Sequence, residues 1–458
     1  MITATQNLET YLDSFAEFSR RSSGQPWLRK LREDAFAVFC ETGFPTTHDE
    51  DWRFTNISAI ARTPFSLPQS STVPSSSKLK PWKLEGAAAQ LVFIDGKFAP
   101  TLSSLASLPA GVTLTSLKDA ITANARILED HFGRYLNFRR DPFCALNTAF
   151  AEDGAFVHIA RGISLHAPIH LLYVSTANDT PTMTNPRNLL VVEREAQATV
   201  IEEYASLGAG TVLSNSATEL VAQENSTVSH YMIELEHAQA FNISTLRIQQ
   251  DRSANVHSHS VLLGGGLVRN NVHPVLAGEG GECLINGLFV GNGRQHLDNY
   301  MYVEHASPHC SSRQFYNGLL DGHAHGVFHG RIVVHKDAQK TDAKQTNRNL
   351  LLSDDAQIDT KPQLEIYADD VKCTHGATIG QIEENALFYL RSRGIDEVAA
   401  RRLLLSAFAN ECVERMNAGL ARDHVERLIE AHLLSMAHSS PQLDSGNAEV
   451  ERSWEEVG

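Results

Sequence analysis

The middle of the chain is dominated by short apolar runs separated by polar turn residues. From Leu91 to about Tyr367, runs of four to six residues rich in Val, Ile and Leu alternate with Gly, Asn, Asp and Ser. Such runs, with few helix signals after residue 150, are typical of β-strands. The pattern predicts a mainly β region over residues 79–367, with some helix at about 115–150.

A weak internal repeat helps to choose between two β architectures. Four strand-like starts each follow a polar turn, and their apolar positions lie 28 residues apart at Val200, Val228, Val256 and Leu284. A parallel β-helix needs such a spacing because each coil packs only against its neighbours. A β-sandwich also has short strands and turns, but nothing in it requires an even spacing. The repeat favours a parallel β-helix core.

Residues 1–61, before the β region, carry a helical pattern. Leu28, Leu31, Ala35 and Phe39 recur at spacings of three and four, which places them on one face of a helix. The following stretch, 62–78, is rich in Ser and Pro, a composition that predicts a flexible connector. We therefore expect an N-terminal helical domain joined to the β core by a linker.

Residues 368–438 return to a helical pattern. Two amphipathic runs, 383–393 and 396–416, are separated by Gly394, which fits a helix stop, and a third run follows near 424–436. These runs predict a C-terminal helical domain.

Composition and charge narrow the function. A chain of 458 residues is long enough for two or three domains. Its formal charge of −15 argues against a general nucleic-acid binder, which needs a basic face. No apolar run is long enough to span a membrane and no secretory signal opens the chain, so we expect a cytoplasmic protein. The polar, acidic residues 439–458 are expected to be disordered.

Common catalytic motifs are missing from the sequence. There is no phosphate-binding loop of the form GxxxxGKS or GxxxxGKT, no GxSxG and no HExxH. The six cysteines are scattered without a CxxC pair, which indicates reduced thiols. We therefore expect that this chain does not hydrolyse ATP by itself.

Histidines are concentrated late in the β region. More than a third of the 21 histidines lie between His296 and His375, and His323, His325 and His329 fall in one short stretch. Strand residues two apart share a face, so these three imidazoles could form an iron or zinc site. The alternative is that they form stacked ladders or hydrogen-bonded turns. A cupin-like metal enzyme would need a carboxylate soon after the HxH pair, and none occurs before Asp337.

A second pair with metal-binding chemistry lies at Cys373 and His375. These residues are two apart, so in an extended strand they project together. Thiolate and imidazole are natural ligands for iron or for a cluster, and the adjacent Lys372 would favour the thiolate. A buried, inert thiol is the alternative. Two ligands do not complete a cluster site, and a subunit interface could supply the rest.

Several long motifs resemble the SufB/SufD family. The match is nearly continuous through residues 330–353, 361–378 and 387–395, and the segments 50–55 and 93–98 near the N-terminus also fit. The Lys-Cys-Thr-His-Gly-Ala form of the motif that begins at Lys372 is closer to the SufD branch than to SufB.

This resemblance implies a right-handed parallel β-helix between two helical domains, and a non-catalytic scaffold subunit of iron–sulfur cluster assembly. It implies pairing with a SufB-like subunit through the β-helix, with His375 and its neighbour Cys373 at the interface where a nascent cluster forms. It also implies that the C-terminal helical domain docks the SufC ATPase, and this role maps onto Leu387, Tyr389, Leu390, Arg393, Leu404 and Phe408.

The resemblance also sets expectations for ligands and assembly. No cofactor is expected to be bound permanently; iron or a nascent cluster would be held transiently at the SufB interface. Reduced flavin in the complex and a homodimer of the isolated chain stay open.

Two other classes of protein also stay open at this point. A β-helix carbohydrate-active enzyme would need paired carboxylates on one face, for which Asp298 and Glu304 are candidates. A stand-alone metal-binding protein would be built on His323, His325 and His329.

Overall fold

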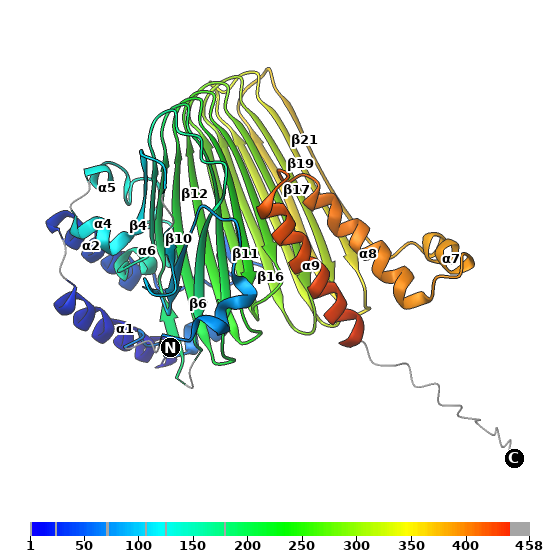
Figure 1. Ribbon diagram of the computed structural model, residues 1–458, viewed down its shortest axis with the longest axis horizontal. Helices are drawn as coiled ribbons and strands as arrows, with labels where there is room; N and C mark the ends of the chain where they lie inside the picture. The colour runs from blue at the N-terminus through cyan, green and yellow to red at the C-terminus, as the bar shows by residue number, and fades with distance from the viewer. Residues whose placement is uncertain are drawn as a thin grey trace, which may run out of the picture.

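The computed structural model describes residues 2–22, 25–69, 73–105, 108–123, 126–177 and 180–439. The chain forms a β-solenoid with helices at both ends (Figure 1), which confirms the predicted fold class. The tail, for which disorder was predicted, lies outside the described residues from 440 onward. No helix in the described ranges has the length and apolar character needed to cross a membrane.

The N-terminal helices cover part of one outer face of the solenoid (Figure 1). Their buried aromatic side chains pack with Leu213 and Ile243 of the solenoid. The helical elements before the main coils are α1 (Ile2–Arg21), α2 (Pro26–Thr42), η1 (Glu50–Trp52), α3 (Ser58–Arg62), η2 (Ser76–Trp82), α4 (Leu117–Thr122), α5 (Arg126–His131) and α6 (Pro142–Ala149).

The Ser- and Pro-rich stretch is not a uniformly flexible connector. Phe65 is 1% exposed and belongs to the N-terminal core, and Ser66 forms a parallel bridge with Thr182. The later part of the stretch enters η2, where Leu79 is buried. The prediction of a free linker is therefore wrong for these parts, because their apolar side chains find partners on the solenoid.

Within the described residues, two sheets form the walls of the solenoid, and the chain alternates between them once the coils are regular. The 11-stranded sheet follows the order β2 (Lys97–Phe98), β1 (Ala89–Ile94), β6 (Ile169–Ser175), β9 (Gln197–Ser206), β11 (Thr227–Leu235), β13 (Asn255–Leu262), β15 (Glu282–Gly291), β17 (Ser311–Leu320), β19 (Asp342–Leu351) and β21 (Lys372–Gly380), with β3 (Ser104–Leu105) beside β1.

The 10-stranded sheet faces it across the core. Its order is β20 (Gln357–Ile366), β18 (His325–Val334), β16 (His296–His305), β14 (Leu267–Leu276), β12 (Ala240–Gln250), β10 (Val212–Ala222), β8 (Arg187–Val192), β5 (Ala155–Ile159) and β4 (Val112–Ser116), with β7 (Thr182–Thr184) beside β10.

The two sheets enclose one continuous apolar core. Leu171, Val228, Phe328 and Ile332 are fully buried between them. Their strands read as apolar runs because most strands are buried on both faces, as expected for a parallel sheet whose outer faces are also covered.

The coils do not repeat at a constant 28 residues. Val228 and Val256 are in register, as predicted, but Val200 lies level with His230 and Leu284 lies level with His257. The register is marked instead by one turn residue per coil, just before the strand of the 11-stranded sheet, with a positive φ. Successive members are 27 to 31 residues apart: Glu195, Asn225, Ser253, Gly280, His309 and Lys340. The turns differ in length from coil to coil, so the predicted constant spacing of 28 residues is wrong.

The β core extends further than its predicted boundary at residue 367. The region assigned to the C-terminal helical domain, 368–438, starts with β21, which pairs along its length with β19. The helices themselves are α7 (Glu384–Ser392), α8 (Glu397–Val413) and α9 (Leu420–Ser439). In Figure 1, α8 and α9 lie across the outer face of the 11-stranded sheet, and α7 projects away from it.

Candidate functional site

Cys373 and His375 lie on β21, the last strand of the solenoid. Cys373 is in register with the buried Ala343, and His375 with the buried Gln345. Both side chains therefore leave the strand on the face that continues the inner wall of the solenoid. Cys373 is half-buried and His375 is exposed.

The surroundings of Cys373 favour the protonated thiol. Burial raises the pKa of Cys373, a bond with the Ala343 backbone lowers it, and the nearby Asp342 carboxylate raises it further. Lys372 leaves the opposite face of the strand, because successive strand residues alternate. The prediction that Lys372 favours the thiolate is therefore wrong.

A row of amide side chains underlies the pair. The Nε2 of Gln345 donates to Oε1 of Gln314 at 2.9 Å, while Gln345 Oε1 is buried with no partner in the described part of the chain. Asn347 and Asn349, further along β19, bond to each other. Sequence reasoning missed this row, although polar residues at every second position of a buried strand were a usable signal.

The end of the solenoid at β20 and β21 is open. Each of these strands has one hydrogen-bonded neighbour in its own sheet, so among the described residues one edge of each is unpaired. Inner-face apolar side chains are exposed there, with Ile366 39% and Ile379 53% accessible. Proteins usually cover such edges and such apolar ends, so this end has the properties of an interface.

The structure does not bring His323, His325 and His329 together. His323 lies in the turn before β18 and faces Asp355, with His323 Nδ1 3.6 Å from the carboxylate. His325 bonds to Asp359 at 2.8 Å. His329 is buried on β18, in register with Tyr300 of β16. No group of three or more His, Cys, Asp or Glu residues in the described ranges is arranged to hold a metal ion.

The histidines form ladders between coils instead. The His325 ring packs edge-on against His296 with centroids 4.7 Å apart, and His329 packs in the same way on Tyr300 at 4.9 Å. The prediction of a three-histidine metal site is wrong because His323 precedes the strand and does not share its face. The alternative, stacked ladders, describes His325 and His329.

The two candidate carboxylates of a carbohydrate-active enzyme are also occupied. Asp298 is fully buried, where it pairs with Arg269 and accepts a hydrogen bond from the Thr55 hydroxyl. Glu304 lies near Arg247 and His335, at 3.7 and 3.6 Å. A pair with one buried, charge-compensated member does not give the two accessible carboxylates that glycoside hydrolysis needs.

The residues predicted to dock an ATPase divide into two groups. Tyr389 on α7 and Arg393 directly after it are exposed, with the Arg393 guanidinium over the Tyr389 ring, while Leu387, Leu390 and Leu404 are half-buried. Phe408 is 8% exposed and packs against the 11-stranded sheet, so it is not accessible for docking and that part of the prediction is wrong. Sequence reasoning did not assign three other exposed apolar residues to this surface: Phe388, Val398 and Leu403.

Helices α8 and α9 are fixed to the solenoid by polar as well as apolar contacts. The Nδ2 of Asn317 donates to the Phe408 carbonyl at 2.8 Å, and Arg348 pairs with Glu411. On α9, His424 bonds to the buried Glu203 at 2.9 Å. None of the residues of α7 is buried, so α7 is held mainly by its packing against α8.

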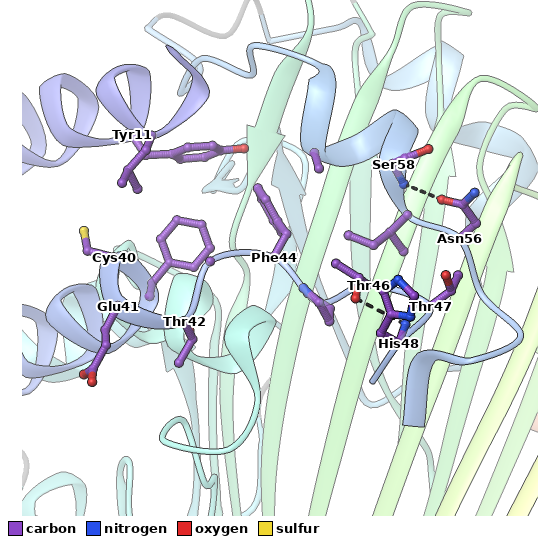
Figure 2. A pocket seen from close by; sticks show the side chains of 16 residues that line it. Tyr11, Cys40, Glu41, Thr42, Phe44, Thr46, Thr47, His48, Asn56 and Ser58 are labelled. Atoms are coloured by element: carbon purple, nitrogen blue, oxygen red, sulfur yellow. Dashed lines mark hydrogen bonds between the residues drawn. The ribbon is translucent and has the colours of Figure 1, made fainter. Parts of the chain in front are cut away.

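A cavity of about 760 Å³ lies in the N-terminal helical region, away from β21 (Figure 2). Figure 2 shows Tyr11 and Phe44 on one side and the 46–48 turn on another, with Cys40 at the margin. Burial raises the pKa of the Cys40 thiol. The wall carries no paired acid and base, so this cavity is not a candidate catalytic site.

Comparisons with known proteins agree with this architecture. Residues 173–408 match the model of the SUF system FeS cluster assembly SufBD core domain, and residues 4–171 match that of the SufBD protein N-terminal region. An iron–sulfur cluster assembly SufBD family protein of Synechocystis is 34% identical, over 84% of this chain and 86% of its own length.

Two relatives carry a more specific name. The iron–sulfur cluster assembly protein SufD of Escherichia coli is 31% identical over 84% of this chain and 89% of its own length. The protein of the same name from Bacillus subtilis is 24% identical over 89% and 94%. The chain therefore belongs to the SufBD family of the SUF system for iron–sulfur cluster assembly.

Proposed function

We propose that this chain is a scaffold subunit of cluster assembly that works only together with other subunits. A SufB-like subunit would pair with the open end formed by β20 and β21. An ATPase subunit of the SufC type would dock on α7 and the exposed side of α8. ATP hydrolysis would belong to that partner.

The observation that carries the proposal is the position of Cys373 and His375. Both lie on the inner face of an edge strand with one unpaired side among the described residues, close to exposed apolar residues such as Ile379. A partner that covers this end would bury the pair within an interface. It would also supply the further ligands that a cluster needs, since this chain offers two here.

The two side chains would act differently toward iron, which is the substrate of assembly. His375 is exposed and can present a ring nitrogen to the metal. Cys373 has a raised pKa, so it must lose a proton as the metal binds. We infer that His375 meets iron first and that Cys373 joins once the interface is closed.

The helices would couple ATP turnover to this end of the solenoid. Movement of a docked ATPase would pull on α8, which contacts β17 and β19 through Asn317 and Arg348. β19 is the strand that pairs with β21. A displacement of α8 thus has a short, packed route to Cys373 and His375.

The experiment is cluster formation by the co-purified complex with His375→Ala. We expect the complex to assemble normally, because the His375 side chain is exposed and its removal takes away no buried contact of the chain. The rate of cluster formation should fall about tenfold or more, because a metal ligand is lost. His309→Ala is the control, since His309 is an exposed histidine in a turn. A normal rate with His375→Ala would remove the proposed role.

A further inference from the structure

A second concave site lies on the outer face of the 10-stranded sheet. It is a groove with a volume of about 500 Å³, within the range of roughly 300 to 1,000 Å³ that small-molecule sites occupy. Its floor is formed by outward-facing residues of β12 to β20, and its second wall by the segment around Tyr135 and Arg140 before α6. Neither the family assignment nor the proposed function uses this groove.

The floor of the groove carries a ladder of flat side chains from successive strands. Arg247, His273, Tyr302 and Arg331 occupy equivalent positions on β12, β14, β16 and β18. The His273 and Tyr302 ring centroids are 5.0 Å apart, and the Arg331 guanidinium lies 5.1 Å from the Tyr302 ring. Burial, with the nearby Arg247 and Arg269, lowers the pKa of His273 to about 3, so the imidazole in this ladder is neutral.

A second set of cation–π contacts lies next to this ladder. The Arg269 guanidinium is 3.9 Å from the Trp52 ring and 4.8 Å from the Tyr300 ring. These three side chains are buried and support the floor from beneath. The accessible floor is the half-buried ladder, in which His273 and Tyr302 lie between Arg247 and Arg331. Such a surface favours a flat π-system laid against it, through stacking and cation–π contacts.

Two arginines in the groove have unused hydrogen-bond donors. Arg247 Nε is buried without a partner in the described residues, while its Nη1 is 3.5 Å from Nδ1 of His273 and 3.7 Å from the Glu304 carboxylate. Arg140, on the other wall, is exposed and has no side-chain partner among the described residues. A buried guanidinium donor left unpaired is costly, which favours an acceptor that arrives with a ligand.

Several carboxylates of the groove are already engaged. Asp141 accepts from the backbone N–H of Phe143 and Cys144 at the start of α6. Glu365 pairs with Arg331 at 2.7 Å. Arg140 and the Nε of Arg247 therefore remain as cationic donors without a partner among the described residues.

We propose that this groove binds a small organic anion with a planar ring, such as a ring-bearing phosphate or carboxylate. The ring would lie on the ladder of His273 and Tyr302. The anionic group would accept hydrogen bonds from Arg247 and Arg140, whose planar guanidinium groups fit two oxygens of a phosphate or carboxylate.

The test is calorimetric titration of the purified full chain with three probes: adenosine monophosphate, adenosine and inorganic phosphate. We expect the monophosphate to bind at least about tenfold more tightly than either half. Arg247→Gln and Arg140→Gln should each weaken this binding about tenfold or more. Arg313→Gln, at a partly exposed arginine of β17 paired with Asp342, should leave it unchanged.

Circular dichroism of each variant establishes that it is folded, and Arg140→Gln, at an exposed site, tests the proposal even if Arg247→Gln does not fold. The proposal fails if the monophosphate binds no better than adenosine or phosphate. It also fails if both arginine variants bind as the wild type does. The readout is independent of cluster assembly, so neither result bears on the proposed function.

Discussion

Buried glutamates in this solenoid have pKa values shifted in opposite directions, depending on their hydrogen-bond partners. Glu203 is fully buried and accepts hydrogen bonds from His170 and His424, both at 2.9 Å. Burial alone would raise its pKa, but these bonds outweigh burial and lower the pKa of Glu203 to about 2. Glu234 and Glu236 have no such imidazole partners among the described residues: burial raises the pKa of Glu234 well above 4.5, and that of Glu236 to about 7.

Glu203→Gln should lower the free energy of unfolding by about 3 kcal/mol at neutral pH, because it removes one partner of a buried charged network. Since the folded pKa is below the ordinary 4.5, the contribution of Glu203 is present above that pH and is lost as pH falls toward 2. The comparison is with Glu193→Gln, where a similar bond from His158 is partly exposed and is worth at most about 1 kcal/mol. Equal urea midpoints for the two variants would contradict this.

Glu234→Gln should have the opposite dependence on pH. Between about pH 4.5 and 7 the folded chain keeps protons on this pair that the unfolded chain releases, so stability falls as pH rises. Removing one carboxyl should raise the melting temperature at about pH 8 relative to wild type and change it less at about pH 5. If the difference in melting temperature between variant and wild type does not vary with pH, ionisation of this pair does not destabilise the folded chain.

The chemistry of Cys373 marks the limit of sequence reasoning at this scale. The spacing of Cys373 and His375 predicted that they share a strand face, since alternation is a local property. The protonation of the thiol could not be predicted, because it depends on Ala343 and Asp342 of the preceding coil. The prediction overweighted the adjacent Lys372, whose side chain leaves the opposite face of the strand.

For helices and strands, the sequence predicted where an element starts better than which of its faces is buried. Asp396 caps α8 by accepting from the Ala399 N–H at 2.9 Å, so the helix start was readable from the chain. The face that α8 buries was not readable, because its whole surface is moderately apolar and only the position of β15 and β17 decides that Phe408 points inward. The predicted 28-residue spacing of the coils was wrong for a related reason, since turn lengths differ from coil to coil.

Phe388→Asp and Phe408→Ala should separate docking from folding. Phe388 is 74% exposed on α7, so its replacement should change stability by less than about 0.5 kcal/mol while weakening association with the ATPase subunit about tenfold or more. Phe408 is buried, so its truncation should cost about 3 to 5 kcal/mol. Thermal melts and pull-down of the ATPase subunit give both readouts. Unchanged association with Phe388→Asp would place the docking surface elsewhere.

For the molecule as a whole, the open end is the feature that makes an isolated chain incomplete. One outer face of the solenoid is partly covered by N-terminal helices and the other by α8 and α9 (Figure 1). The inner-face residues Ile366 of β20 and Ile379 of β21 stay exposed. The sequence predicted a solenoid but gave no sign of which coil would be the last, because β21 was assigned to the helical region.

Ile379→Lys should prevent pairing at this end without unfolding the chain. Ile379 is 53% exposed on the inner face of β21, so a lysine there is tolerated in the isolated chain but is buried unpaired in an interface. Thr378→Lys, on the opposite face of the same strand, is the matched control and should pair normally. Co-purification with the SufB-like subunit measures the effect. Loss of pairing in both variants, or in neither, would argue against an interface on the inner face.

The most direct test is hydrogen exchange of the β21 backbone, Lys372–Gly380, measured in the isolated chain and again in the complex with the SufB-like subunit. Amides on the free edge of β21 should exchange rapidly in the isolated chain and become strongly protected in the complex, while those of β11 and β13 should stay protected throughout. If β21 exchanges equally fast in both states, the open end is not where this chain meets its partner, and the assignment of Cys373 and His375 to a shared cluster site is contradicted.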